Sequence, residues 1–326
     1  MPTLPLLAVT VGDPAGIGPE VTLAALADRE LRAKFRALVL GPACLRPASI
    51  PSLEVGADPR HIEHQAWLAT AGDGPFHMGR ASAECGRAAL SALRRGVELA
   101  MAKQVDALVT APVSKEALHL AGEKVEGQTE LLGRWAGVSN HQMVAIAGPL
   151  RVMLLTRHLP LRQALDAITP ERVFFHLELL HRTLVELGFK KPRLALAGIN
   201  PHAGEGGILG REELELFPAA LERARAIGID VSGPLSPDTV FLSAFRGRFD
   251  GVLAHYHDQA FIAAKIAAPD TGLTLIAGLP FLRVSPAHGT AFDLAGKGLA
   301  SAENMKVALG QTAEWAPRRP TPAPSR

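Results

Sequence analysis

Histidine follows predicted buried strands at three places in the chain. The residues concerned are His158, His202 and the pair His255 and His257. Neutral imidazole is a common nitrogen ligand of zinc and similar metals. Their spacing matches no short zinc motif, so spacing alone leaves open whether these side chains converge on a metal or serve as capping and surface residues.

Lys115 also follows a predicted strand, and further polar residues lie near other motifs in the last third of the chain. Lys115, Lys265 and Arg283 are typical of solvated surface charges, but together they could supply the positive field that a phosphorylated substrate needs. Asp238 precedes Thr239 and could be a metal carboxylate or a general base. Aspartate in this setting is also a common helix or turn cap, and the local sequence favours the cap.

The elements that must position these residues alternate along the chain. Short apolar runs predict strands at Leu6–Val11, Ala37–Leu40, Ala107–Thr110, Met143–Ala147, Val152–Leu155, Leu194–Ala197, Val252–Ala254 and Leu273–Ala277. Amphipathic stretches predict helices at Pro19–Ala27, Ala83–Lys103, Pro170–Leu187 and Arg211–Ile227. This alternation predicts an α/β protein with largely parallel sheets. Ligands of such proteins bind where loops leave the carboxyl ends of strands.

Composition narrows the class of protein. The chain has 326 residues, 48% of them apolar, which predicts a large core divided between two lobes. Two cysteines are too few for a disulfide framework or a thiolate metal cluster, and they fit a reducing compartment. A net charge of +2 and 5% aromatic residues argue against nucleic acid as a partner. No apolar stretch predicts a membrane span and no signal peptide is apparent, so we expect a soluble cytoplasmic protein.

A dinucleotide fingerprint is missing. The glycine-rich segment 204–210 precedes a predicted helix but does not place glycine in the Gly-x-Gly-x-x-Gly register. A nicotinamide cofactor would therefore have to bind by another route. The proline-rich end, residues 315–326, predicts a disordered tail.

Several longer segments resemble one family along nearly the whole chain, the 4-hydroxythreonine-4-phosphate dehydrogenases. They are residues 12–20, Thr110–Val113, Asn200–Gly207 and His255–Gln259. Residues 288–298 also resemble the cofactor loop of the isopropylmalate dehydrogenases, which share a fold with that family.

The resemblance implies a two-lobed α/β fold like that of the isopropylmalate dehydrogenases, not a classical Rossmann fold. We expect residues 1–130 with 285–314 to form the first lobe and residues 131–284 the second. It also implies a homodimer that binds one divalent metal (Zn, Mg, Co or Mn) per subunit at the subunit interface. The implied metal ligands are His158, His202 and His257, and the implied NAD or NADP contacts are His288, Gly289, Thr290 and Asp293. His255 is then expected to pack or hydrogen-bond beneath the site.

Substrate contacts implied by the resemblance fall on Gln128, Thr129, Lys265, Thr274 and Arg283. Two of them depart from the family pattern, because Gln128 stands where the family has histidine and Thr274 where it has asparagine. Glutamine keeps hydrogen-bonding groups but cannot titrate, and threonine lacks an amide donor. Lys265 and Arg283 keep the chemistry that binds a phosphate.

The expected function is metal-dependent, NAD(P)-linked oxidation and decarboxylation of 4-phosphohydroxy-L-threonine to 3-amino-2-oxopropyl phosphate in pyridoxal phosphate synthesis. Asp238 is the candidate for proton transfer. The departures leave open erythronate or threonate 4-phosphate, or a dihydrodiol, as the substrate. A protein that binds a metabolite without turning it over is the alternative from another class.

Overall fold

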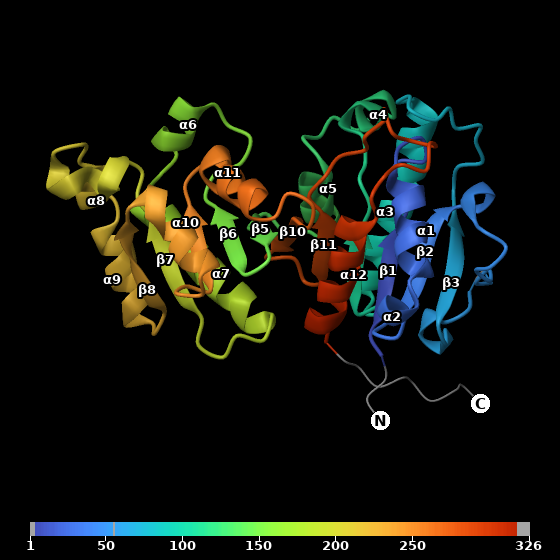
Figure 1. The fold of residues 1–326 in the computed structure, drawn as a ribbon, viewed down its shortest axis with the longest axis horizontal. Helices are drawn as coiled ribbons and strands as arrows, with labels where there is room; N and C mark the ends of the chain where they lie inside the picture. The colour runs from blue at the N-terminus through green and yellow to red at the C-terminus, as the bar shows by residue number, and fades with distance from the viewer. Residues whose placement is uncertain (1–3, 55, 318–326) are drawn as a thin grey trace. The chain divides into compact units, whose positions relative to one another are not determined.

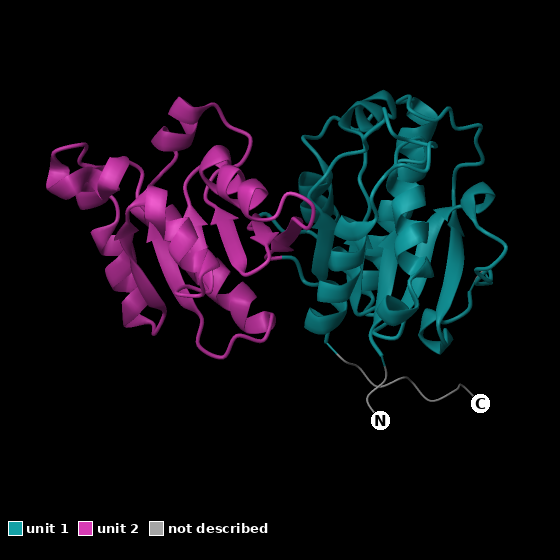
Figure 2. Ribbon diagram, viewed as in Figure 1, with its two compact units in different colours: residues 1–139, 279–326 teal, residues 140–278 magenta. Residues whose placement is uncertain are grey.

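Each apolar run that the sequence assigns to a strand overlaps a strand of the computed structural model, which describes residues 4–54 and 56–317. The strands belong to two compact units, residues 1–139 with 279–326 and residues 140–278 (Figure 2). The boundaries between the units differ from the expected ones. The first lies after residue 139 instead of residue 130, and the second lies after residue 278 instead of residue 284. The later first boundary keeps the helix at 128–135 in the first unit, and the earlier second boundary places Arg283 there too.

The first unit holds a five-stranded sheet in which every neighbouring pair is parallel (Figure 1). Its order is β3 (Gln65–Thr70), β2 (Arg36–Pro42), β1 (Leu6–Thr10), β4 (Ala107–Thr110) and β11 (Leu282–Pro286). Its helices are α1 (Gly18–Ala27), α2 (Arg29–Arg32), α3 (Ala83–Met101), α4 (Lys115–Leu120), α5 (Gln128–Trp135) and α12 (Glu303–Trp315). The long helix α3 packs against β1 to β4, and α12 packs against β4 and β11.

The second unit is built on six strands. Their order is β10 (Leu273–Ala277), β5 (Gln142–Ala147), β6 (Leu150–Leu154), β9 (Gly251–Ala254), β7 (Arg193–Ala197) and β8 (Asp230–Leu235). Only β5 runs antiparallel to its neighbours. Its helices are α6 (Leu161–Asp166), α7 (Pro170–Glu186), α8 (Glu212–Glu215), α9 (Pro218–Ala226), α10 (Pro237–Phe245) and α11 (His257–Ala267). The expectation of an α/β fold with mostly parallel strands is confirmed.

Local details differ from the expectation. The stretch Arg211–Ile227 is not one helix, because Pro218 lacks an N–H and begins a separate helix, α9. Trp315 ends α12 rather than beginning a tail, and residues 318–326 lie outside the described residues. None of the helices described is long and apolar enough to cross a membrane.

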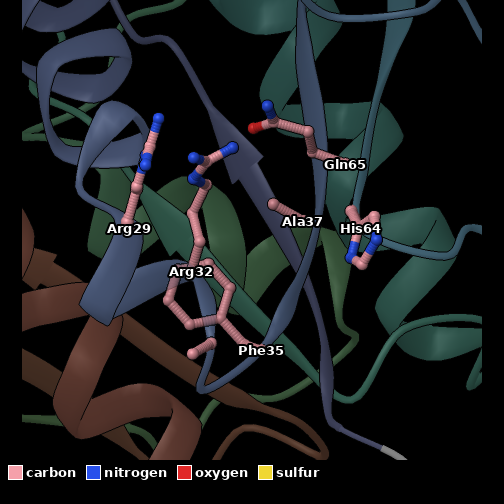
Figure 3. A pocket seen from close by; sticks show the side chains of 7 residues that line it. Arg29, Arg32, Phe35, Ala37, His64 and Gln65 are labelled. Atoms are coloured by element: carbon pink, nitrogen blue, oxygen red, sulfur yellow. The ribbon is translucent and has the colours of Figure 1, made fainter.

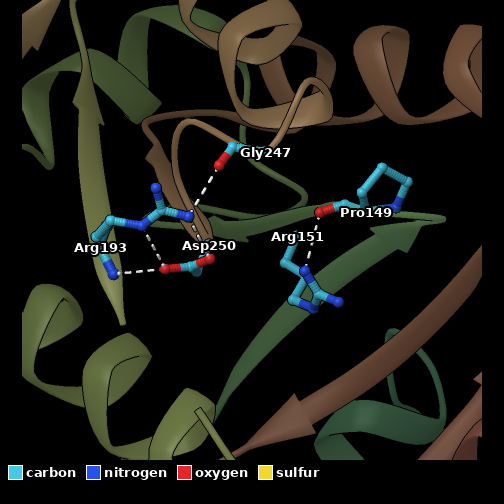
Figure 4. Close-up of polar contacts among 5 residues, drawn as sticks. All are labelled: Pro149, Arg151, Arg193, Gly247 and Asp250. Atoms are coloured by element: carbon cyan, nitrogen blue, oxygen red, sulfur yellow. Dashed lines mark hydrogen bonds and ion pairs between the residues drawn. The ribbon is translucent and has the colours of Figure 1, made fainter. Parts of the chain in front are cut away.

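An ion pair joins the amino-terminal ends of β7 and β9 (Figure 4). The Asp250 carboxylate accepts hydrogen bonds from the Arg193 backbone N at 2.8 Å and from its Nε and Nη2 at 3.1 and 3.0 Å. Burial alone would raise the pKa of Asp250, but the hydrogen bonds from Arg193 lower it overall. The carboxylate therefore fixes the end of the second sheet that lies opposite the histidine loops.

Candidate active site

The candidate ligands of the second unit follow four parallel strands that are neighbours in the sheet. His158 comes after β6, His257 after β9, His202 after β7 and Asp238 after β8. Carboxyl ends of parallel strands lie at one edge of a sheet, so all four residues stand on loops or helix starts at that edge. The expected position after a strand is confirmed for the three histidines, whereas the strand before Asp238 was not predicted.

His158 and His257 lie next to each other, with ring centroids 5.7 Å apart. Their segments are joined because the Thr156 hydroxyl donates to the backbone oxygen of His255 at 2.7 Å. The Nδ1 of His257 lies 2.7 Å from the Asp258 carboxylate, which can only accept, so Nδ1 carries the proton. That bond leaves Nε2 of His257 as the ligand atom, an arrangement typical of metal-binding histidines.

His202 lies in a left-handed turn. His202, Ala203 and Glu205 have φ angles of 53°, 55° and 45°. Left-handed conformations cost about 1–2 kcal/mol for each residue other than glycine, so the surrounding structure must hold this turn in place. Strain of this kind gathers at functional sites, which is consistent with a ligand role for His202.

Glu213 holds the segment that leads into this turn. Its buried carboxylate accepts from the backbone N–H groups of Ile199 and Asn200, both at 2.7 Å, and from the Asn200 amide at 2.8 Å. Burial alone would raise the pKa of Glu213, but these hydrogen bonds hold it below its ordinary value. The sequence analysis missed Glu213, which resembles a surface residue in the run Glu212–Glu215.

The described residues of one chain do not by themselves form a complete metal site. The described residues contain no group of three or more histidine, cysteine or acidic side chains placed to hold a metal ion. The donors nevertheless fit a divalent metal, because two imidazoles lie side by side and Asp258 orients one of them. His202 has a side chain that is 64% exposed. His158 is exposed as well, and two adjacent ligands with a third on an exposed turn suit a site completed by a second copy of the chain.

His255 is fully buried and packs beneath the histidine loops, as expected. Its ring stacks on Phe217 with centroids 5.0 Å apart, and its Nε2 lies 2.7 Å from the Ala197 carbonyl oxygen. Burial lowers the pKa of His255 to about 4, so the ring is neutral at physiological pH. It orders the loop between β9 and α11.

The remaining candidates of the second unit occupy different settings. Asp238 is exposed in the first turn of α10 and accepts a 2.6 Å hydrogen bond from the hydroxyl of Ser236, which is the residue before the helix. It thus belongs to a helix start, although Ser236 holds the cap position. Lys265 is exposed in the last turn of α11, and Thr274 is buried in β10.

In the first unit the structure brings Arg283 and Gln128 together. The Arg283 side chain is 3% exposed, and its Nε and Nη2 donate to the Thr110 hydroxyl at 3.1 and 2.6 Å. Nη2 also donates to Gln128 Oε1 at 2.9 Å. Gln128 in turn donates from Nε2 to the Ala111 carbonyl oxygen at 3.1 Å, which fixes the orientation of its amide.

These contacts leave one end of the guanidinium available. Among the described residues, Nη1 of Arg283 has no hydrogen-bond partner and no carboxylate forms an ion pair with the group. Burial lowers the pKa of Arg283 to about 9, with no neighbouring acid to offset the effect. A buried cation without a counter-charge is costly, so this site is built for an anionic ligand. Thr129, a second implied contact, is buried in α5.

The implied cofactor loop rests on the segment between β1 and α1. The backbone N–H of Ile17 donates to the Thr290 carbonyl oxygen at 3.0 Å, and a Cβ on Gly16 would lie 3.0 Å from Thr290. Glycine therefore permits the close approach of the two backbones. His288, Gly289 and Asp293 lie in the same loop, and His288 and Gly289 contact each other through Nδ1 and the carbonyl oxygen at 3.0 Å.

Asp13 lies in the segment between β1 and α1 and contacts the loop after β4, which binds Gln128 beside Arg283. It was not among the site residues predicted from the sequence. Its backbone N–H donates to the Pro112 carbonyl oxygen at 2.9 Å, and its Oδ1 accepts from the Ala15 N–H at 3.0 Å. Burial raises the pKa of the Asp13 carboxyl. Asp13 thus joins the loop after β1 to the loop after β4, whose Ala111 contacts Gln128.

Comparisons with known proteins bear on the family of the chain and on its overall structure. The family model described as pyridoxal phosphate biosynthetic protein PdxA matches residues 23–312. The chain is 41% identical to D-threonate 4-phosphate dehydrogenase of Cupriavidus necator, over 97% of this chain and 98% of the relative. It is 39% identical to the Salmonella typhimurium protein of the same name, over 93% and 96%. A crystal structure of 4-hydroxythreonine-4-phosphate dehydrogenase from Klebsiella pneumoniae has a TM-score of 0.85 at 36% identity and covers 96% of this chain and 98% of that one.

Proposed function

Because this chain belongs to the family of the pyridoxal phosphate biosynthetic protein PdxA, we propose that it oxidises threonate 4-phosphate with NAD or NADP and a divalent metal. The chain is a dehydrogenase, as expected. From the sequence we expected 4-phosphohydroxy-L-threonine as the substrate and kept threonate 4-phosphate as an alternative. We now propose threonate 4-phosphate. The relatives named D-threonate 4-phosphate dehydrogenase support that change.

The buried Arg283 is the observation that carries the proposal. Its Nη1 has N–H groups that no described residue uses, so it can donate a charge-assisted hydrogen bond to a phosphate oxygen. Thr110 and Gln128 hold the other donors, so the guanidinium is oriented before the substrate binds. Lys265 is retained as a second phosphate contact on the resemblance alone.

The side chains that bind Arg283 are uncharged, which favours a substrate acid that has no ammonium group. Threonate carries a hydroxyl where hydroxythreonine carries a charged nitrogen. The side chains that bind Arg283 are a hydroxyl and an amide, and no carboxylate is among them to balance an ammonium. The amide of Gln128 has both a donor and an acceptor but no charge, which suits a substrate whose only charges are negative.

The reaction follows from the substrate. The nicotinamide, when bound, would supply the hydride acceptor for carbon 3, and Asp238 is the proposed base for the proton of the hydroxyl on that carbon. The 3-oxo acid then loses carbon dioxide from carbon 1, and carbon 2 takes up a proton. The products from threonate 4-phosphate are carbon dioxide, dihydroxyacetone phosphate and the reduced cofactor.

His158, His202 and His257 would hold the divalent metal. A bound metal supplies a Lewis acid that favours loss of the hydroxyl proton and stabilises the negative charge that develops during decarboxylation. Asp258 keeps His257 in the tautomer with Nε2 unprotonated, and Thr156 keeps the His158 segment against the His257 segment. The loop of residues 288–298 would bind the cofactor.

A homodimer fits the surface of the second unit. Large apolar side chains are exposed on its helices and on the loop before α8, namely Leu161, Leu165, Ile208, Leu209, Leu214, Leu242, Phe245, Ile262 and Ile266. Ile208 and Ile266 are 81% and 78% exposed. Exposed apolar residues in this number are typical of a protein interface. A second copy of the chain that covers them would bring its own histidines to the same surface.

Substrate ranking tests the proposal. We expect turnover on threonate 4-phosphate to exceed turnover on 4-phosphohydroxy-L-threonine, and Gln128→His to reduce that preference at least several-fold. Imidazole cannot accept from Arg283 and donate to Ala111 as the amide does unless it is neutral, and when protonated it repels Arg283. Initial rates of nicotinamide reduction on both substrates give kcat/KM for each.

Gln104→His, which makes the same replacement in the loop after α3, is the matched control and should leave the ranking unchanged. Faster turnover on 4-phosphohydroxy-L-threonine by the unaltered protein would restore the first expectation. An unchanged ranking in Gln128→His would show that residue 128 does not set specificity.

A further inference from the structure

A second pocket lies in the first unit at the amino ends of β2 and β3. One cavity of about 280 Å³ is lined by residues of α2, the loop after it and the starts of both strands. A neighbouring cavity of about 410 Å³ shares Arg32, His64 and Gln65 with it. The two together fall within the range of roughly 300–1,000 Å³ that is typical of small-molecule sites. Arg283, by contrast, contacts Thr110 at the carboxyl end of β4.

Polar atoms buried at this pocket have no partner. Arg32 Nε and Gln65 Oε1 are both inaccessible to solvent and make no hydrogen bond with the described residues. Figure 3 shows the Gln65 amide and the guanidinium groups of Arg29 and Arg32 pointing into the same space. Buried polar groups are nearly always satisfied, so a donor and an acceptor left together at one cavity are available to a ligand or a water that enters it.

The charge of the pocket is positive. Arg29 and Arg32 form no ion pair with any described residue, and His64 stands on the opposite side. The acidic residue that lines the adjoining cavity is Glu63, which is exposed. Asp28, next to Arg29, is already engaged with Lys306 and with the N–H groups of α2. Two arginines on one helix therefore lack a counter-charge.

The remaining lining is apolar. Phe35 lies below the Arg32 guanidinium in Figure 3, and Ala33 and Ala37 also line the cavity. Phe35 is 2% exposed, and Ala37 is also buried. Such a lining suits the carbon skeleton of a ligand, whereas water or an inorganic ion gains nothing from it.

We propose that this pocket is a second binding site for a small organic anion. Arg29 and Arg32 bind its carboxylate or phosphate group, Gln65 accepts from a hydroxyl on it, and Phe35 contacts its apolar part. The site is independent of the dehydrogenase chemistry, since none of these residues belongs to the loops at the carboxyl ends of the strands.

Binding of three probes to the full-length protein tests the site. The probes are 4-hydroxybenzoate, 4-hydroxyphenyl phosphate and inorganic phosphate, titrated by calorimetry while the side-chain amide signals of Gln65 are followed by NMR. We expect an aromatic anion to shift the Gln65 signals and to saturate. Arg32→Gln should weaken that binding about ten-fold to a hundred-fold and reduce the number of sites per chain by one. The aromatic probe that binds with the lower Kd shows whether the site prefers a carboxylate or a phosphate.

Lys34→Gln is the matched control, because Lys34 is exposed two residues from Arg32 and does not line the pocket. Lys34→Gln should bind the aromatic probes as the unaltered protein does. Arg32→Gln should have the same dehydrogenase turnover as the unaltered protein. The proposal is overturned if no aromatic probe shifts the Gln65 signals, if Arg32→Gln and Lys34→Gln bind equally well, or if inorganic phosphate binds as tightly as the aromatic anions. These binding results do not depend on the proposed dehydrogenase reaction, so the two proposals can fail separately.

Discussion

Replacing Arg283 by alanine is expected to raise the Michaelis constant for threonate 4-phosphate about ten-fold to a hundred-fold. A charge-assisted hydrogen bond is worth about 1.5–3 kcal/mol, and Arg283 can donate one to the phosphate from Nη1. The Michaelis constant for unphosphorylated threonate should change much less, because that substrate lacks the phosphate that the guanidinium is proposed to bind. Steady-state kinetics on the two substrates give the ratio. Arg283→Lys should fall between, since lysine keeps the charge but loses the bonds to Thr110 and Gln128 that orient the guanidinium.

Arg36→Ala is the control for loss of a partly buried arginine in the same unit. Arg36 donates to the backbone oxygens of Leu4, Arg60 and Ile62 at the amino end of β2, so its loss should lower stability and leave the ratio unchanged. Equal losses on phosphorylated and unphosphorylated threonate in Arg283→Ala would refute the assignment of this residue to phosphate binding.

Removal of one histidine ligand is expected to empty the metal site. Purified protein should contain about one divalent metal per subunit, and His158→Ala, His202→Ala and His257→Ala should each lose most of it, since three-ligand sites rarely tolerate the loss of a ligand. Asp258→Asn should weaken the affinity by about ten-fold to a hundred-fold, because the amide orients His257 less strongly. Elemental analysis after dialysis measures the metal bound to each variant.

His61→Ala removes an exposed histidine of the first unit and should retain the metal. Wild-type metal content in all three ligand variants would exclude the site. The proposed dimer adds a further expectation, that a mixture of His202→Ala and His158→Ala chains regains part of the metal if ligands come from two subunits.

Much of the fold could be predicted, because buried parallel strands appear as short apolar runs. Three strands escaped for local reasons. β3 is fully buried at only two of its six residues, β8 contains Gly233 and Pro234, and β11 contains Arg283 among its buried residues. A charged residue hides a strand from an apolar pattern, and here that residue is the one with a proposed role in binding phosphate.

The site could be predicted only as far as strand ends. The positions after β6, β7 and β9 drew attention to His158, His202 and His257, while Asp238 was chosen from its local sequence and the family resemblance selected the ligands. Contacts between distant residues, such as Glu213 with Asn200, left no sequence signal. The bond between Gln128 and Arg283, 155 residues apart, also required the structure.

Appearance of the reduced nicotinamide at 340 nm with threonate 4-phosphate tests the central claim most directly. With metal, cofactor and substrate present, we expect reduced cofactor, carbon dioxide and dihydroxyacetone phosphate to form in equal amounts. Calorimetry on the same preparation records whether the substrate binds. Saturable binding of threonate 4-phosphate and of the other four-carbon acid phosphates without any reduction of NAD or NADP would contradict the account and leave a metabolite-binding protein in place of an enzyme.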